Sequence, residues 1–148
     1  ANAFRIGLWG HSMGGIITLR VITVDRTISS AVLYGSMSAD ERVNFQHVYD
    51  FWTNGRDGIE ELNTPAERIA QISPLTYMER IRTRISLHHG TADASVPLQW
   101  GIDLCDQMTE REIEVECYFY EGEGHIFSGE ADNLFQARVV AFFRRSLG

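Results

Sequence analysis

The sequence contains no lysine, and all 13 of its basic residues are arginines. Its 20 acidic residues give a net charge of −7 and a pI near 5.1. Proteins that bind nucleic acid or anionic membranes through their charge carry an excess of basic residues, and this chain has the opposite balance. We therefore expect no nucleic-acid partner. The acidic, lysine-free surface is compatible both with adaptation to salt and with a bias in genomic base composition.

Cysteine and long apolar runs are also scarce. The two cysteines, Cys105 and Cys117, are too few for a disulfide scaffold, and we expect two reduced, largely buried thiols. No stretch approaches the ~20 apolar residues of a membrane span, and no secretory signal is recognisable. At 148 residues the chain is expected to form one domain, over residues 1–148. These features together predict a cytoplasmic protein.

The most informative stretch is residues 10–15, which read Gly-His-Ser-Met-Gly-Gly. It follows an apolar run at 4–9 that suits a buried strand, and it precedes an apolar segment at 16–24. A Gly-x-Ser-x-Gly between a strand and a helix is typical of the nucleophile elbow, so we expect 16–24 to be a buried helix despite its β-branched residues. The motif predicts a strained backbone at Ser12, with Gly10 and Gly14 required because a Cβ would collide with the strand and the helix. The alternative is a glycine-rich turn with an ordinary hydroxyl.

Strands alternate with helices along the rest of the chain. Further strands are predicted at 28–34, 84–88 and 113–120, and helices at about 40–53, from Pro97, and from about Asp132 to the C-terminus. Residues 37–83 hold no strand, and a capping box is expected at 64–67. The period-two alternation of 113–120 is typical of a strand near a sheet edge. This order predicts an α/β fold with a parallel sheet.

Two details of packing follow from helical spacing. Leu98, Ile102, Cys105 and Met108 are expected to form the buried stripe of the helix after Pro97. Phe51 and Trp52, in the segment without strands, could line an acyl pocket, but we expect them in the core.

Two loops that follow predicted strands hold partners for a reactive serine. Asp93 is the only carboxylate in the loop 89–97, and His125 is the only imidazole in the loop 121–127. A serine nucleophile needs a base and a carboxylate that orients this base, in the chain order Ser, Asp, His for this class of fold. The N–H of Met13 is the expected oxyanion donor. The alternatives are a helix N-terminal carboxylate for Asp93 and a surface histidine for His125.

The other histidines are interpreted as structural. His11 is expected to pack near the elbow, His88 and His89 to point to opposite faces of a strand end, and His47 to lie on a surface helix. Asp40 and Glu41 suit a helix N-terminus. No spacing of histidine, cysteine and carboxylate residues is typical of zinc, and we predict no metal and no cofactor.

Four motifs together resemble the α/β-hydrolase superfamily. They are residues 10–15, Ser73-Pro74, residues 89–93 with Val96-Pro97, and residues 122–127. The chain looks most like the C-terminal half of the catalytic domain of the prolyl oligopeptidase family and its esterase-like relatives. The likeness implies a truncated α/β-hydrolase fold, with about four mainly parallel strands and helices on both faces. It also implies a triad of Ser12, Asp93 and His125, with an oxyanion amide from Met13.

These observations predict a serine hydrolase of carboxylic esters with short to medium acyl chains. Ester cleavage is favoured because it needs less transition-state stabilisation than peptide cleavage. The alternatives are a catalytic fragment of a prolyl oligopeptidase-type peptidase, and an inactive binding or oligomerisation module. The apolar strand at 4–9 would lie unpaired at a sheet edge, so we expect a homo-oligomer in which this strand pairs with its copy.

Overall fold

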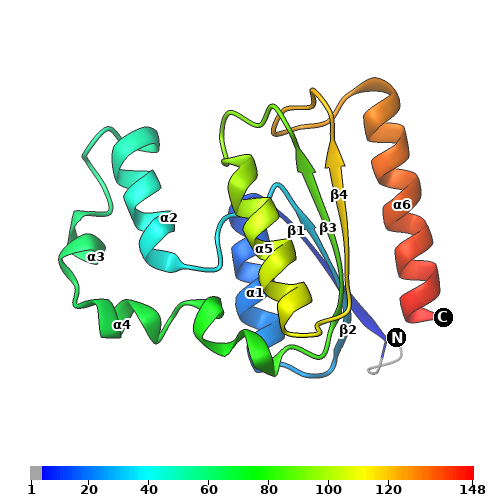
Figure 1. Ribbon diagram of the computed structural model, residues 1–148, viewed down its shortest axis with the longest axis horizontal. Coiled ribbons are helices and arrows are strands. Elements are labelled where there is room, and N and C mark those ends of the chain that lie inside the picture. The colour runs from blue at the N-terminus through cyan, green and yellow to red at the C-terminus, as the bar shows by residue number, and fades with distance from the viewer. Residues whose placement is uncertain (1–4) are drawn as a thin grey trace.

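A four-stranded parallel sheet forms the centre of the molecule (Figure 1). This computed structural model describes residues 5–148. The strands lie in the order of the chain and are β1 (Ile6–His11), β2 (Ile28–Tyr34), β3 (Arg84–Gly90) and β4 (Val115–Tyr120). The predicted α/β fold and the predicted edge position of β4 are confirmed, while Phe4 of the predicted first strand lies outside the described residues.

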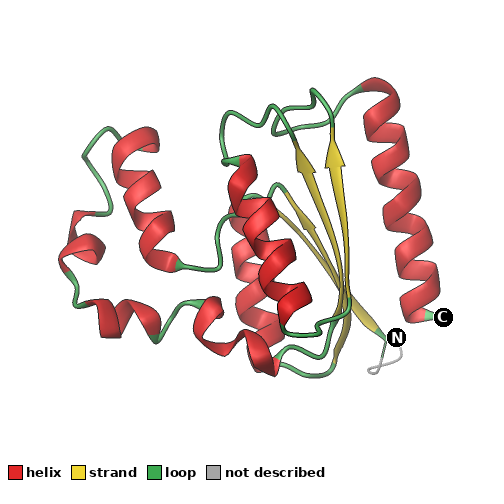
Figure 2. Cartoon of the chain, viewed as in Figure 1, coloured by secondary structure: helices red, strands yellow, loops and turns green. Residues whose placement is uncertain are grey.

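Helices cover both faces of the sheet (Figure 2). The helices α1 (Met13–Val24) and α5 (Leu98–Glu110) lie on one face, and α6 (Gly129–Leu147) lies on the other. Because successive side chains of a strand point to opposite faces, β2 contributes Ala31 and Leu33 to the first face and Val32 and Tyr34 to the second.

Each face has its own buried cluster. On the side of α1 and α5 the core includes Ile16, Leu19, Ile22, Ala31, Leu33, Ile85, Leu87, Val96, Leu104 and Met108. On the side of α6 it consists of Val32, Tyr34, Tyr120, Phe127, Phe135 and Phe142. The second cluster is largely aromatic, and it packs beneath the loop that follows β4.

The strand register brings the carboxyl ends of the strands to one edge of the sheet. His11 is opposite Tyr34, Tyr34 is opposite His88, and Gly90 is opposite Tyr120. The loops after β1, β3 and β4 therefore begin side by side. This arrangement positions the site described below.

Residues 37–83 contain no strand, as predicted, and most of this segment forms a lobe beside α1 and α5 (Figure 1). It consists of α2 (Glu41–His47), a π-helix (Val48–Trp52), α3 (Ile59–Asn63), α4 (Ala66–Ala70) and a 3-10 helix (Pro74–Arg80). Asp40 caps α2 by accepting a hydrogen bond from the N–H of Arg42 at 2.9 Å. The expected capping box at 64–67 is wrong, because the Thr64 hydroxyl donates backward to the carbonyl of Glu60.

The apolar stripe predicted for α5 is also wrong in part. Gly101, Leu104 and Met108 face the core, whereas Leu98, Ile102 and Cys105 are only partly buried. Gly101 belongs to this buried face because the ring of His89 packs against it, and a Cβ there would lie 2.5 Å from Nδ1 of His89. The buried face of α5 is therefore centred on Gly101, Leu104 and Met108 and not on the predicted stripe.

Cys105 and Cys117 form a disulfide bond, so the expectation of two reduced thiols is wrong. Cys105 lies on the side of α5 that faces β4, and Cys117 lies on β4. Their Cα atoms are 6.3 Å apart, within the range that a disulfide spans. The bond ties the edge strand to the helix that covers it.

The strand β1 forms the other edge of the sheet, with Ile6 and Trp9 exposed. Beside it, α1 is largely apolar but is neither apolar nor buried all round: Arg20 pairs with Glu41 on its surface, and Met13, Ile17, Val21 and Val24 are exposed. No helix within residues 5–148 is long and apolar enough to span a bilayer.

Candidate active site at the carboxyl edge of the sheet

Ser12 joins β1 to α1 in a conformation that L-residues rarely adopt, with φ 57° and ψ −121°. Hydrogen bonds fix it on both sides: its N–H donates to the carbonyl of Tyr34 at 2.9 Å, and its carbonyl accepts from Gly15 at 2.9 Å and Met37 at 3.3 Å. A strained backbone persists only where its surroundings hold it in this way. The side chain of Ser12 is thereby presented at the end of the sheet.

Gly10 and Gly15 make this turn possible. The motif predicted Gly10 and Gly14 instead. A Cβ at Gly10 would lie 2.2 Å from the carbonyl oxygen of Gly14, and a Cβ at Gly15 would lie 2.4 Å from the hydroxyl of Ser36. A Cβ at Gly14 would meet nothing within 4 Å. The expectation that Gly14 is required is therefore wrong, because a side chain at this position would extend into open space.

Asp93 and His125 are brought together from separate loops. Nδ1 of His125 donates to Oδ2 of Asp93 at 2.7 Å, and the side chain of Asp93 is fully buried while that of His125 is 21% exposed. The other carboxylate oxygen, Oδ1, accepts from the N–H groups of Ser95 and Val96 at 2.8 and 2.9 Å. Asp93 thus closes its own turn and orients a histidine, and it does not cap α5, whose N-terminal cap is Pro97.

The loop that carries His125 is anchored by two residues at the strand ends. Nε2 of His11 donates to the backbone carbonyl of His125 at 2.9 Å, and the N–H of Phe127 donates to the phenolic oxygen of Tyr34 at 2.6 Å. The rings of His11 and Tyr34 stack with centroids 4.4 Å apart. Burial lowers the pKa of His11 and raises that of Tyr34, so both side chains are neutral at pH 7.

His11 packs beside the elbow as predicted, but its contact with the His125 loop was not foreseen. No local sequence signal indicates this contact, because it depends on the register that places His11 opposite Tyr34.

The residue that precedes the serine contacts this pair. The ring of His11, which precedes Ser12, has its centroid 4.4 Å from that of His125. Within residues 5–148 the Ser12 hydroxyl makes no hydrogen bond, and bonds of this kind often tighten only when substrate binds. Met13 is the first residue of α1, where an N–H has no acceptor inside the helix. Its amide is free to point at a developing negative charge.

His88 and His89 are both buried and point to opposite faces, as predicted: His88 packs against Phe135 of α6, and His89 packs against Gly101 of α5. His89 nevertheless reaches the site: its Nε2 donates to the carbonyl of Val96 at 3.1 Å and lies 3.5 Å from Oδ2 of Asp93. Burial lowers the pKa of His89, so this imidazole is neutral. Among the described residues, no three His, Cys, Asp or Glu side chains gather as metal ligands would.

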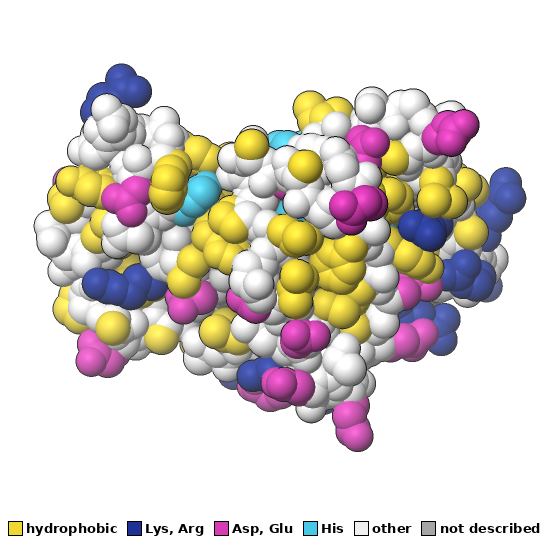
Figure 3. Space-filling view, turned by 45° about the horizontal axis from the view of Figure 1, so that its top comes forward, with side chains coloured by type: hydrophobic (Ala, Val, Ile, Leu, Met, Phe, Trp, Pro, Cys, Tyr) yellow, Lys and Arg dark blue, Asp and Glu magenta, His cyan; other side chains and the backbone are white. Residues whose placement is uncertain are grey.

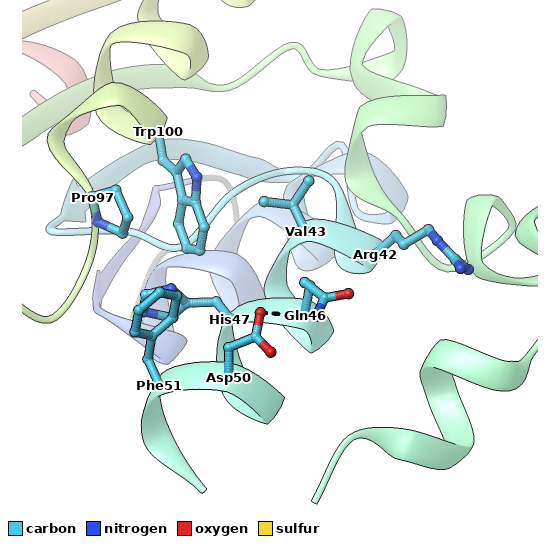
Figure 4. Close-up of a pocket in the computed structure, with 8 residues that line it drawn as sticks. All are labelled: Arg42, Val43, Gln46, His47, Asp50, Phe51, Pro97 and Trp100. Atoms are coloured by element: carbon cyan, nitrogen blue, oxygen red, sulfur yellow. Dashed lines mark hydrogen bonds between the residues drawn. The ribbon is translucent and has the colours of Figure 1, made fainter. Parts of the chain in front are cut away.

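A pocket of about 430 Å³ lies between the lobe and the start of α5 (Figure 4). It is lined by Arg42, Val43, Gln46, His47, Asp50, Phe51, Pro97 and Trp100. Figure 3 shows hydrophobic side chains and a histidine gathered around the hollow between the lobe and the body of the molecule. Phe51 is 74% exposed and Trp52 40%, so the expectation that they belong to the core is wrong.

A parallel sheet with a strained serine after one strand, and an aspartate–histidine pair after two others, is the arrangement of the α/β-hydrolase fold. More specifically, the family model described as "Prolyl oligopeptidase family" matches residues 1–148, and the chain belongs to that family. The relationship inferred from the four motifs is confirmed.

Individual relatives agree with this assignment. The chain is 26% identical over 110 residues to the probable dipeptidyl-aminopeptidase B of Neurospora crassa, which covers 74% of the chain and 12% of that protein. It is 23% identical over 133 residues to the acylamino-acid-releasing enzyme of Arabidopsis thaliana, a match that covers 84% of this chain and 17% of that protein. The chain therefore spans less than a fifth of the length of these curated relatives.

Solved structures share the fold. A puromycin-hydrolyzing peptidase of Mycobacterium tuberculosis superposes with a TM-score of 0.82 and 25% identity, over 100% of this chain and 23% of that one. The dipeptidyl peptidase 4 of Porphyromonas gingivalis gives a TM-score of 0.81 at 22% identity, over 99% and 20%. These relatives are named as peptidases, so the comparisons do not support the predicted preference for carboxylic esters.

Proposed function

We propose that this chain carries the reacting groups of a serine peptidase and cleaves an amide bond through an acyl-enzyme. In this assignment Ser12 is the nucleophile, His125 is the general base and then the general acid, and Asp93 orients His125. The observation that supports it most directly is the 2.7 Å hydrogen bond between Asp93 and His125, beside the strained serine. Membership of the prolyl oligopeptidase family favours the peptidase over the ester hydrolase.

The hydrogen bond between His125 and Asp93 indicates which nitrogen of His125 acts as the base. A carboxylate only accepts hydrogen bonds, so the bond to Asp93 places the proton of neutral His125 on Nδ1 and leaves Nε2 as the base. Nε2 takes the hydroxyl proton as Oγ of Ser12 attacks the carbonyl carbon, and the adjacent carboxylate stabilises the imidazolium that forms. The N–H of Met13 donates to the oxyanion.

The same groups then release both products. The imidazolium returns its proton to the leaving amine, which departs and leaves an ester on Ser12. A water molecule, deprotonated by Nε2, attacks this ester and frees the acid. An ester substrate would pass through the same steps with a better leaving group, so we expect ester cleavage as a second activity and not as the natural one.

The test compares wild type with Ser12→Ala on three kinds of substrate: dipeptidyl p-nitroanilides, N-acyl amino acid p-nitroanilides and p-nitrophenyl butyrate. Labelling by a fluorophosphonate, followed by mass spectrometry of the labelled peptide, identifies the nucleophile independently of the substrate. We expect label on Ser12 and amide cleavage that Ser12→Ala abolishes.

Three other outcomes would decide against the peptidase. Serine-dependent cleavage of the butyrate alone would restore the ester hydrolase. Folded protein that neither labels nor turns over any substrate would favour the binding module. Turnover retained in Ser12→Ala would remove Ser12 from the mechanism.

A further inference from the structure

His47 links the helical lobe to the loop that carries Asp93. It is the last residue of α2, and its Nε2 lies 2.9 Å from the backbone carbonyl oxygen of Ser95. A carbonyl oxygen only accepts hydrogen bonds, so Nε2 of His47 is the donor. Interpreted from the sequence as a surface residue, His47 is in fact partly buried at this junction.

The peptide group that receives this bond also holds Asp93. The carbonyl of Ser95 and the N–H of Val96 belong to one planar peptide unit, and this N–H donates to Oδ1 of Asp93 at 2.9 Å. His47 and Asp93 therefore form hydrogen bonds to opposite ends of the same rigid peptide group. A bond donated to the carbonyl also polarises the peptide and strengthens the bond that its N–H donates.

We propose that His47 is a positioning residue for the reaction, acting on Asp93 through the peptide group between Ser95 and Val96. The proposal rests on the function assigned above. With Oδ1 held by this peptide, Oδ2 is directed at Nδ1 of His125, 2.7 Å away. Loss of the donor at His47 weakens the hold of this peptide on Oδ1, which the N–H of Ser95 then mainly carries, and Asp93 fixes the tautomer of His125 less firmly.

The ring of His47 is itself held by the lobe. Its centroid lies 5.0 Å from that of Phe51, 5.5 Å from that of Trp52 and 4.9 Å from that of Trp100. Together with Phe51 and Trp100 it lines the pocket between the lobe and α5 (Figure 4). One side chain thus belongs both to the wall of this pocket and to the hydrogen-bond chain that ends at His125. A role in packing alone would depend on the ring and not on the donor.

Two variants separate these roles. The amide nitrogen of His47→Gln reaches about as far as Nε2 and can donate to the carbonyl of Ser95, whereas the amide of His47→Asn is one methylene too short. We expect His47→Asn to lower kcat about ten- to a hundredfold with KM changed less than about twofold, because a small displacement of a catalytic group has this scale of effect. We expect His47→Gln to stay within about threefold of wild type.

Gln99→Ala is the matched control, because Gln99 is exposed on α5 outside the pocket and its side chain donates to Asp103 at 2.8 Å and not to the Asp93 loop. It should leave kcat unchanged. Equal losses in His47→Gln and His47→Asn would show that the ring matters and not the donor. An unchanged kcat in His47→Asn would overturn the proposal.

A second measurement does not require turnover. The 15N shifts of the His125 ring report which nitrogen carries the proton. In wild type and His47→Gln we expect the proton on Nδ1, and in His47→Asn a mixture of tautomers. The same tautomer in all three proteins would overturn the inference even if the chain proves inactive.

The two hypotheses fail separately. Absence of serine-dependent turnover in wild type contradicts the proposed function, whereas the 15N shifts still decide the role of His47. If His47→Asn does not fold, as judged by circular dichroism, His47→Phe serves as the non-donor variant, because it keeps an aromatic ring against Phe51 and Trp100.

Discussion

At the scale of single residues, the elbow depends on two close approaches. The backbone at Ser12 is held by neighbours that come so near that Gly10 and Gly15 have no room for a side chain. Gly14 occupies the position that completes the sequence motif, yet it faces open space within the first turn of α1. The two glycines that flank the serine should therefore respond differently to the same substitution.

Gly10→Ala should lower the free energy of unfolding by about 1–3 kcal/mol, because its methyl group would collide with the Gly14 carbonyl and force the backbone apart. Gly14→Ala should be neutral or raise it by up to about 1 kcal/mol, since alanine is the better helix former. Urea denaturation of both variants beside wild type measures the difference. Equal losses would mean that the two glycines are equivalent after all.

A second residue-scale feature is the buried His88. The hydroxyl of Ser86 donates to Glu116 at 3.0 Å, so it must accept from Nε2 of His88 at 2.9 Å. Nδ1 of His88 then accepts from the hydroxyl of Tyr120 at 2.9 Å. Every donor and acceptor in this row of hydrogen bonds is satisfied only when His88 is neutral. Burial, together with the positive charge of Arg138, lowers the pKa of His88 to about 3.

This pKa makes the fold sensitive to acid. The unfolded chain binds a proton at His88 near pH 6.5, whereas the folded chain does not until about pH 3. Stability from this group is therefore complete above pH 6.5 and falls by about 1.4 kcal/mol for each pH unit between 6.5 and 3. Urea titrations at pH 7, 6 and 5 should show this fall, with a smaller slope in His88→Gln. Parallel slopes would show that His88 does not cause it.

At the scale of elements, a disulfide bond links the edge strand β4 to α5, the helix that covers it. Cys105 and Cys117 are 12 residues apart, so the bond closes a short loop. It lowers the conformational entropy of the unfolded chain, and in the folded chain it holds β4 against its covering helix. Disulfides are typical of oxidising compartments, which bears on the cytoplasmic location predicted from the sequence. That location stays a prediction.

Replacing both cysteines in Cys105→Ser/Cys117→Ser should lower the free energy of unfolding by about 2–4 kcal/mol, because the unfolded chain regains the freedom that the bond removes. Thermal and urea unfolding measure this change. Wild type with dithiothreitol should behave like the variant without it. Two thiols titrated in wild-type protein denatured without reductant would show that the bond is not formed.

At the scale of the whole molecule, the two edge strands of the sheet differ in how they are covered. At one edge, β4 is tied to α5. At the other, β1 has no neighbouring strand on its outer side among residues 5–148, and it exposes the side chains of Ile6 and Trp9 next to the exposed apolar side of α1. An exposed apolar edge of this kind pairs readily with another strand.

We propose that the 148-residue chain on its own dimerises through β1. Sedimentation should show association that grows with concentration in wild type and is lost in Ile6→Lys/Ile17→Lys, which places charge on this surface. Phe119→Lys is the control, because Phe119 is 41% exposed on the opposite edge strand. A wild-type chain that stays monomeric across the concentration range would contradict the proposal, and so would loss of association in Phe119→Lys.

Much of this architecture could be predicted because the signals are local. The segment 28–34, which ends at Gly35-Ser36, was predicted as a strand, and the structure has β2 there. The glycines, the serine and the chain order of Asp93 and His125 indicate the elbow and the loops that meet at one edge. The α5 stripe and the capping box failed because the packing of His89 and the actual bond of Thr64 override helical spacing and propensity.

The sequence by itself determined the family, the parallel α/β order and the loops from which the candidate reacting groups come, since each depends on residues that are near one another in the chain. Only the tertiary structure decided that Gly15 and not Gly14 is crowded, that the cysteines are bonded, and that His47 reaches the Asp93 loop. These contacts join segments brought together by strand register and helix rotation. A one-dimensional pattern does not specify either of them, because both depend on the volume and direction of side chains packed from elsewhere.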